Sequence, residues 1–282
     1  MLIRNKEFDF KNNAYIMGIL NVTPDSFSDG GKWNEVDRAV KHVEDMINEG
    51  ASIIDIGAES TRPGHTPVSS EEELERVIPI IRKIRENFDI PISLDTYKAN
   101  TLREVVKEGA DILNDVWGLK SDPEIAKTAK ELDVPVILMH NKDNNNYNDL
   151  MKDLNRETLE SAELAKKAGI KDELIILDPG VGFALDYEKD LTVVNRIREF
   201  VDLGYPVLLG TSRKRFIGKA MGIDVATERD FGTAITTAIG VMNGCSIFRV
   251  HNVKESYDAM RMALAIKREG KDRKSTRLNS SH

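Results

Sequence analysis

The chain of 282 residues contains a single cysteine, Cys245, so it forms no intrachain disulfide and no zinc site built from several cysteines. No run of about 18 apolar residues occurs, which excludes a transmembrane helix of the usual kind. The first ten residues, MLIRNKEFDF, lack the apolar core of a signal peptide. We therefore expect a cytoplasmic protein that has no membrane partner.

Positive charge is also scarce, because 40 Lys and Arg stand against 47 Asp and Glu and give a formal net charge of −7. Proteins that bind the phosphate backbone usually carry a basic surplus, so we expect no nucleic-acid partner. The sequence has neither a Gly-x-Gly-x-x-Gly nor a Walker motif, which argues against ordinary nucleoside triphosphate hydrolysis. Any anionic ligand must be met by local positive charge.

The chain does contain eight short apolar runs, each followed by a segment with helical periodicity. The runs are nearly continuous, which is typical of parallel strands buried on both faces. Eight such units match the usual size of a (β/α)8 TIM barrel, with an open doubly wound sheet as the alternative. We predict a single α/β domain, a TIM barrel with a short N-terminal extension, over residues 1–268, and a disordered or non-native tail over 269–282. The predicted strands are 14–20, 52–58, 91–94, 111–114, 134–139, 174–177, 206–210 and 246–250.

Local signals place the first helices. Apolar residues recur at helical spacing at 36, 40, 43 and 47, and Gly50 then stands where a helix commonly ends. Ser70 followed by Glu73 predicts a capping box at the start of the next helix. Two long loops rich in Gly, Pro, Ser and Thr, at 21–33 and 60–69, follow the first two strands.

Polar side chains follow every predicted strand. In a barrel the carboxyl ends of the strands meet at one rim, where catalytic residues are found, so these side chains should converge. Asp55, inside the second strand, is either a buried hydrogen-bonding residue or a ligand contact. Cys245 lies at the other end of its strand, and we interpret it as a core residue. The rim residues that matter below are Asn21, Arg62, Asp95, Asn114, Asp178, Lys214, Arg249 and His251.

The rim chemistry divides into two groups. Asp95, Asn114 and Asp178 offer acceptors that suit a flat heterocycle with adjacent N–H donors, as in a guanidine-like ring. The second group suits an anion and contains Asn21, Arg62, Arg249 and His251, with Lys214 between the groups. Asn21 with a nearby carboxylate could hold Mg²⁺, which binds through one or two protein oxygens plus substrate phosphates.

Several contiguous motifs identify a family. The stretch GILNVTPDSFSDGG at 18–31 resembles the signature of dihydropteroate synthases, and so does DIGAESTRPG at 55–64. The resemblance covers about residues 2–268. It continues through SLDTYKA (93–99), NDVWGL (114–119), LMH (138–140), DPGVGF (178–183), TSRKRFIG (211–218) and RVHNV (249–253).

The resemblance implies a transferase of folate biosynthesis. Such enzymes join 6-hydroxymethyl-7,8-dihydropterin diphosphate to p-aminobenzoate, giving 7,8-dihydropteroate and diphosphate. They use Mg²⁺, are commonly homodimers and are targets of sulfonamides, which imitate p-aminobenzoate. An SN1-like course, with early diphosphate departure and capture by the arylamine, fits the absence of a nucleophile–base pair. An arylamine is neutral at pH 7 and needs positioning more than deprotonation.

The resemblance also assigns roles to residues. The pterin would contact Asp95, Asn114, Asp178 and Lys214. The diphosphate and its metal would contact Asn21, Thr61, Arg62, Arg249 and His251. The p-aminobenzoate would lie near Phe27, Pro63, Phe183 and Ser212. The loop that carries Asp29 would close over the substrates, so the expected catalytic set is Asn21, Asp29, Arg62, Asp95, Lys214, Arg249 and His251.

The sequence departs from the family pattern at two places. Leu185 stands where a Lys is common, and Asn252 stands where the closing motif usually has Asp. Two other functions stay open at this point. One is a pterin-binding methyltransferase domain, which would have no need of a diphosphate site; the other is a catalytically silent pterin-binding homologue, which the Leu185 departure would favour.

Overall fold

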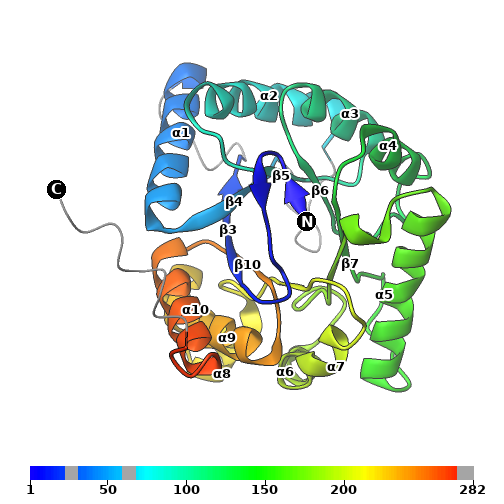
Figure 1. Cartoon of the computed structure of the whole chain (residues 1–282), viewed down its shortest axis with the longest axis vertical. Coiled ribbons are helices and arrows are strands. Elements are labelled where there is room, and N and C mark those ends of the chain that lie inside the picture. Colours follow the sequence, from blue (N-terminus) through cyan, green and yellow to red (C-terminus); the bar gives the residue numbers. More distant parts are fainter. Residues whose placement is uncertain (23–30, 59–67, 272–282) are drawn as a thin grey trace.

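A computed structural model describes residues 1–22, 31–58 and 68–271, and its centre is a barrel of eight parallel strands (Figure 1). Each predicted strand is present, with its ends shifted by at most two residues. The expected (β/α)8 barrel is therefore confirmed. Its strands are β3 (Tyr15–Asn21), β4 (Ala51–Gly57), β5 (Ile92–Asp95), β6 (Ile112–Asp115), β7 (Val136–Met139), β8 (Ile175–Asp178), β9 (Leu208–Leu209) and β10 (Ile247–Val250).

The pairing order excludes the open-sheet alternative. The strands follow one another as β8-β7-β6-β5-β4-β3-β10-β9, and every pair is parallel. A parallel bridge between Leu177 in β8 and Val207, just before β9, joins the two ends of this order. An open doubly wound sheet would keep two unpaired edges, whereas closure into a barrel removes both.

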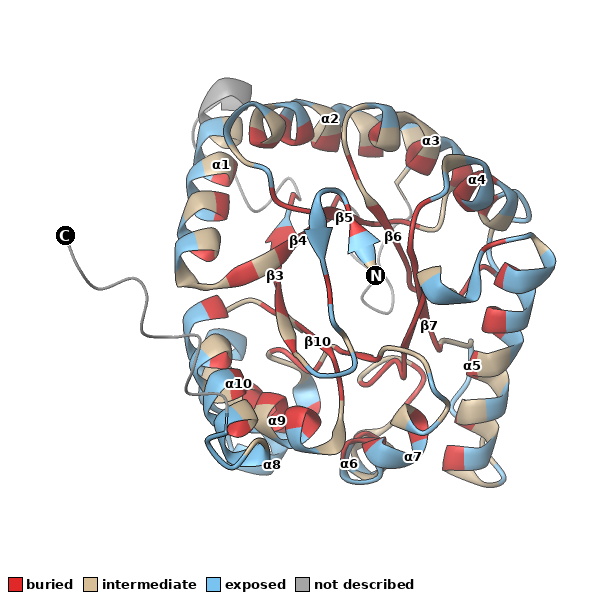
Figure 2. Ribbon diagram, in the orientation of Figure 1, coloured by how far each residue is buried: buried red, intermediate tan, exposed pale blue. Residues whose placement is uncertain are grey.

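Helices surround the barrel, with their buried residues turned toward the strands (Figure 2). Within the described residues, no helix is both long enough and apolar enough to span a bilayer. The helices are α1 (Gly31–Glu49), α2 (Ser70–Asn87), α3 (Ala99–Lys107), α4 (Ile125–Leu132), α5 (Leu150–Lys167), α6 (Tyr187–Asn195), α7 (Ile197–Val201), α8 (Arg215–Met221), α9 (Asp230–Asn243) and α10 (Val253–Lys267), with short 3-10 turns η2 (Asp172–Leu174) and η3 (Ala226–Glu228).

The predictions for the first two helices are confirmed, except for the residue that caps the second. The apolar face of α1 packs on the barrel, and Gly50 has the left-handed φ of +113° expected after a helix. The capping prediction was wrong by one residue, because Ser69 caps α2 by accepting a hydrogen bond from the Glu72 amide at 3.1 Å. Glu71, Glu72 and Glu73 follow two serines, so the sequence offers two overlapping frames for the same motif.

An apolar floor closes the amino end of the barrel. Seven strands contribute one inward side chain each to a cluster that also takes in Ile3 and Phe8 from the N-terminal extension. The extension is a hairpin of β1 (Leu2–Ile3) and β2 (Lys6–Glu7), which lies across the end of the barrel (Figure 1). The strand residues of the floor are Met17, Ile53, Ile112, Ile137, Ile176, Leu208 and Ile247.

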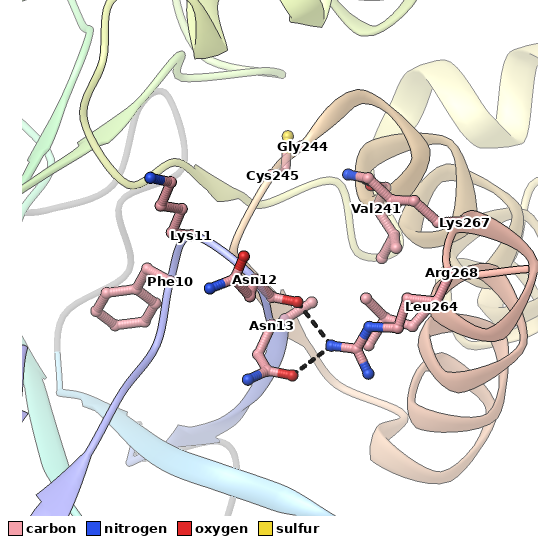
Figure 3. A pocket seen from close by; sticks show the side chains of 11 residues that line it. Phe10, Lys11, Asn12, Asn13, Val241, Gly244, Cys245, Leu264, Lys267 and Arg268 are labelled. Carbon is pink, nitrogen blue, oxygen red and sulfur yellow. Dashed lines mark hydrogen bonds between the residues drawn. The ribbon is translucent and has the colours of Figure 1, made fainter. Parts of the chain in front are cut away.

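A hollow of about 670 Å³ lies beside this floor, between residues 10–14 and the α9 and α10 helices (Figure 3). Arg268 donates to the Asn12 carbonyl at 2.6 Å and to the Asn13 side chain at 2.5 Å. Lys267 donates to the Val241 carbonyl at 2.9 Å. Two of the cations that line this hollow therefore tie the N-terminal extension and α9 to the last helix.

Candidate active site

The rim residues arise from the two-residue period of the strands. Side chains two positions apart point to the same face of a strand, so the residue two steps beyond each floor residue also points into the barrel. In β4 this step leads from Ile53 to Asp55, and in β8 from Ile176 to Asp178. The same step reaches Asn114 in β6 and Arg249 in β10. Four of the seven floor strands therefore place a polar side chain in a layer directly above the apolar floor.

Arg249 connects the charged groups of this layer. Its Nε donates to Asp55 Oδ2 at 2.6 Å, and an Nη donates to Asp95 Oδ2 at 3.1 Å. Asn114 donates through Nδ2 to both oxygens of Asp55, at 3.3 and 3.4 Å. Asp55 has no solvent exposure, which favours its interpretation as a buried hydrogen-bonding residue. Arg249, which we grouped with the anion-binding residues, therefore also contacts the carboxylates Asp55 and Asp95.

Asp95 has one carboxylate oxygen that can still accept a hydrogen bond. Its Oδ1 is buried and has no hydrogen-bond partner among the described residues. Burial raises the pKa of the Asp95 carboxyl to about 7, with Arg249 opposing the rise and Asp55 adding to it. Although burial lowers the pKa of the Arg249 guanidinium, its two carboxylate neighbours more than offset this and the pKa is raised. An unpaired buried carboxylate oxygen is costly unless a ligand supplies the missing donor.

Asp178 and Lys214 stand on the other side of the layer. Asp178 uses Oδ1 to accept the Gly180 amide at 2.8 Å, so it forms the turn after β8 and still has a second oxygen. Burial raises the pKa of its carboxyl, and Lys214 opposes the rise. Lys214 donates to the Val181 carbonyl and lies 4.5 Å from the centre of the Phe183 ring. Burial lowers the pKa of Lys214 to about 8, with Asp178 opposing the fall.

Ser212 and His251 lie together beyond β9 and β10. Ser212 Oγ is 2.9 Å from His251 Nδ1 and also accepts the His251 amide at 3.0 Å. This double contact fixes the orientation of the imidazole. Asn21, at the exposed end of β3, lines one hollow together with His251. The structure thus brings together Asn21, Ser212 and His251 at the side of the rim nearest α1.

Five of the predicted site residues lie outside the described residues: Phe27, Asp29, Thr61, Arg62 and Pro63. Two other strand-end residues serve the fold. Asp115 accepts the Trp117 and Leu119 amides, each at 2.8 Å, and so holds the turn after β6. His140 lies 2.8 Å from Glu157 of α5.

The two departures from the family pattern have local explanations. Leu185 is buried and belongs to the apolar core between barrel and helices, so no positive charge stands at this position. Asn252 caps α10 by accepting the Glu255 amide at 3.2 Å. Its Nδ2 also donates to Asp230 at 3.2 Å, a contact for which an Asp would have no donor.

Arg38 and His42 of α1 were missed from the sequence, which indicates no functional role for either residue. Both side chains are exposed, yet both line the hollow that contains Asn21 and His251. Their spacing of four residues does place them on one helix face. That signal shows which residues share a face, but the direction of the face depends on how α1 packs beside β3.

Comparisons with known proteins identify the family of the chain. Residues 17–251 match the family described as pterin binding enzyme. The chain is 53% identical to the dihydropteroate synthase of Clostridium beijerinckii over 263 residues, which cover 93% of this chain and 97% of that protein. It is 51% identical to the dihydropteroate synthase of Bacillus subtilis over 261 residues, covering 93% and 91%.

Solved structures give the same result. A crystal structure of the dihydropteroate synthase of Clostridium difficile in the presence of pteroic acid aligns with a TM-score of 0.89 and 50% identity, covering 92% of this chain and 99% of that one. The Xanthomonas albilineans enzyme in complex with 7,8-dihydropteroate aligns at 0.84 with 36% identity, covering 91% and 94%. The chain belongs to the pterin-binding enzyme family, as one of its dihydropteroate synthases.

Proposed function

We propose that this chain joins 6-hydroxymethyl-7,8-dihydropterin diphosphate to p-aminobenzoate and releases 7,8-dihydropteroate and diphosphate. The observation that carries the proposal is the acceptor layer above the apolar floor, where Asp95 and Asp178 each keep a carboxylate oxygen for a ligand. The similar structures with pteroic acid, 4-aminobenzoic acid and 7,8-dihydropteroate support the choice of ligands.

The pterin is assigned to the deep part of the layer. Its amino and ring N–H groups form a flat edge of donors, which matches the free oxygen of Asp178 and the unpaired Oδ1 of Asp95. Asn114 adds an amide beside them, and Lys214 can donate to an acceptor of the ring. Buried donors and acceptors that are left unpaired when the ligand is wrong give such a pocket its selectivity.

The diphosphate is assigned to the side of the rim that contains Asn21, Arg249 and His251. An Arg guanidinium and an imidazole are suitable donors for phosphate oxygens. Thr61 and Arg62 remain proposed partners of the diphosphate on the strength of the resemblance. Asp29 and its loop likewise remain a proposed cover for the bound substrates.

Mg²⁺ fits this side of the rim. Asn21 presents an exposed amide at the end of β3, and Mg²⁺ often binds through one or two protein oxygens plus substrate phosphates and water. No cluster of three or more His, Cys, Asp or Glu able to hold a metal occurs among residues 1–22, 31–58 and 68–271, so Asn21 with the diphosphate is the donor set we propose. When bound, the ion would neutralise charge on the diphosphate oxygens.

The reaction then needs little covalent chemistry from the protein. The C–O bond to the diphosphate breaks and its electron pair leaves with the oxygen, while the pterin ring delocalises the positive charge. The amine of p-aminobenzoate forms the new C–N bond and loses a proton. Arg249 and His251 stabilise the charge that develops on the departing oxygen. Ser212 and Phe183 are assigned to the p-aminobenzoate side, with Phe27 and Pro63 assigned there by resemblance.

The test is product formation by the full chain. Pterin diphosphate, p-aminobenzoate and Mg²⁺ should give 7,8-dihydropteroate, detected by mass spectrometry. A sulfonamide should lower the rate by competing with p-aminobenzoate and not with the pterin. Pterin binding with no product under these conditions would instead identify a catalytically silent homologue.

We also propose that the chain forms a homodimer through α9. Phe231, Ile235, Ile239 and Met242 recur every three or four residues on the outer face of α9, and all four side chains are exposed. Met221 of α8 and Met262 of α10 are exposed as well. An exposed apolar helix face of this kind usually marks an interface.

A further inference from the structure

A second hollow, of about 430 Å³, opens at the rim beside α1. It is the hollow that contains Asn21 and His251, and it is formed by β3, α1 and the segments after β9 and β10. Its volume lies within the range of small-molecule sites, roughly 300–1,000 Å³. Its polar lining consists of Asn21, Arg38, His42, Arg213 and His251.

The ionisable residues that line the hollow are all basic. Two arginines and two histidines line the hollow, and no carboxylate is among its described lining residues, although the whole chain has a net charge of −7. Such a concentration of basic groups in an acidic protein creates a local field that favours an anion. The hollow therefore has the electrostatic character of an anion site.

Arg38 and His42 are the two basic residues that α1 contributes to the hollow. Arg213 is bound by Asp230 through two hydrogen bonds of 2.7 and 2.8 Å, so its guanidinium is largely neutralised. Arg38 and His42 are exposed and make no ion pair or hydrogen bond within the described part of the chain.

We propose that Arg38 and His42 form an outer diphosphate subsite, which receives the diphosphate after its bond to the pterin has broken. The inference rests on the proposed function, because Asn21 and His251 are shared between this hollow and the proposed diphosphate position. The departing diphosphate gains negative charge, and Arg38 offers it a planar set of donors nearer the solvent. The free product, and not the pterin ring, is the ligand of this subsite.

The experiment is calorimetric titration of the full chain with inorganic diphosphate and Mg²⁺. Arg38→Gln should weaken diphosphate binding about tenfold, which corresponds to about 1.4 kcal/mol, and the double variant with His42→Gln should weaken it further. Arg38→Lys should bind more tightly than Arg38→Gln because it keeps the charge. Binding of 6-hydroxymethylpterin, which has no diphosphate, should not change.

Lys41→Gln is the matched control. Lys41 lies on the same helix but pairs with Glu44 and Asp45 at 2.8 Å and does not line the hollow, so its loss should leave diphosphate binding unchanged. If Arg38→Gln and the double variant bind diphosphate as the wild type does, the subsite is wrong. Wild-type formation of dihydropteroate in the same preparation would show that the proposed function survives that result, whereas no product would refute the proposed function separately.

Discussion

Asp178 illustrates how one side chain serves both the fold and the site. One oxygen accepts the Gly180 amide and shapes the turn after β8, while the other is available to a ligand. From the sequence, an Asp directly before Pro179 and Gly180 fits either a turn former or a ligand contact. The structure allows both, because a carboxylate has two oxygens that can face different partners.

Asp178→Asn should separate the two roles. Asn can still accept the Gly180 amide through its oxygen, but its NH₂ group now meets the pterin donors. We expect affinity for 6-hydroxymethylpterin to fall at least about 100-fold, since two hydrogen bonds to a charged acceptor are lost. Stability at pH 8 should not fall, because burial already raises the pKa of this carboxyl and disfavours its charge.

The control for this prediction is Asp115→Asn, a buried carboxylate whose oxygens both accept turn amides. It should lower the free energy of unfolding and leave pterin affinity nearly unchanged. Calorimetry and urea unfolding measure the two quantities. Unchanged pterin affinity in Asp178→Asn would show that the assigned pocket is wrong.

Lys214 should make stability depend on pH in the alkaline range. Its folded-state pKa is lowered from 10.5 to about 8, so the stability it contributes is fully present above pH 10.5 and is lost as pH falls through about 8. From pH 7 to 9.5, wild type should gain up to about 2 kcal/mol relative to Lys214→Met. Lys219→Met, which removes an exposed charge from α8, should show no such difference from wild type in urea unfolding. A wild-type difference from Lys214→Met that stays constant with pH would contradict the assignment.

At the scale of elements, the sequence predicted the strands well because their apolar runs reflect burial on both faces. The two-residue period within those strands also explains why polar rim residues stand above the floor. Two other features, the helix cap at Ser69 and the hollow beside α1, could not be predicted from the sequence. The cap at Ser69 depended on the helix frame in which Glu73 is buried against Lys98 and Thr101. The hollow beside α1 depended on the rotation of that helix, which is set by packing against β3 and β4.

The turn after β8 gives an element-scale prediction. Gly180 has a φ of +69°, and an added Cβ would lie 2.0 Å from the His140 carbonyl oxygen, which is backbone and cannot move freely. Gly204 has a φ of +91° but nothing within 4 Å of an added Cβ. Gly204→Ala should therefore cost only the conformational strain, about 1–2 kcal/mol.

Gly180→Ala should cost at least about 1–3 kcal/mol more than Gly204→Ala, because overpacking adds to the same strain. It should also weaken pterin binding, since Asp178 is held by the Gly180 amide. Urea unfolding of both variants provides the comparison. Equal losses of stability would mean that the β7 and β8 loops are not packed as described.

At the scale of the whole molecule, the residues that stabilise the barrel and the residues of the candidate site lie at opposite ends of the barrel axis. The apolar floor and the N-terminal hairpin close one end, and the polar layer occupies the other. Cys245 is buried near the closed end, as expected of a core residue. Of the expected site residues, those at strand ends could be tested for position, whereas Phe27, Asp29, Thr61, Arg62 and Pro63 lie outside the described residues.

The apolar face of α9 predicts the assembly. The wild-type protein should have twice the chain mass of 31.6 kDa by light scattering, and Ile235→Glu should lower the mass to that of one chain. Leu164 of α5 has a similar exposed fraction, 39% against 45%, but lies outside this face. Leu164→Glu should therefore leave the dimer intact. A wild-type protein that is monomeric at working concentrations would refute the proposed dimer.

The most direct test of the whole account is diphosphate release from the pterin diphosphate in the presence of Mg²⁺, measured with and without p-aminobenzoate. The proposed reaction predicts that steady-state release requires p-aminobenzoate and that each diphosphate is accompanied by one dihydropteroate. Saturable binding of the pterin diphosphate with no release in the presence of p-aminobenzoate would contradict it. The rim would then bind pterins without turning them over, and Leu185 would be the first position to restore to Lys.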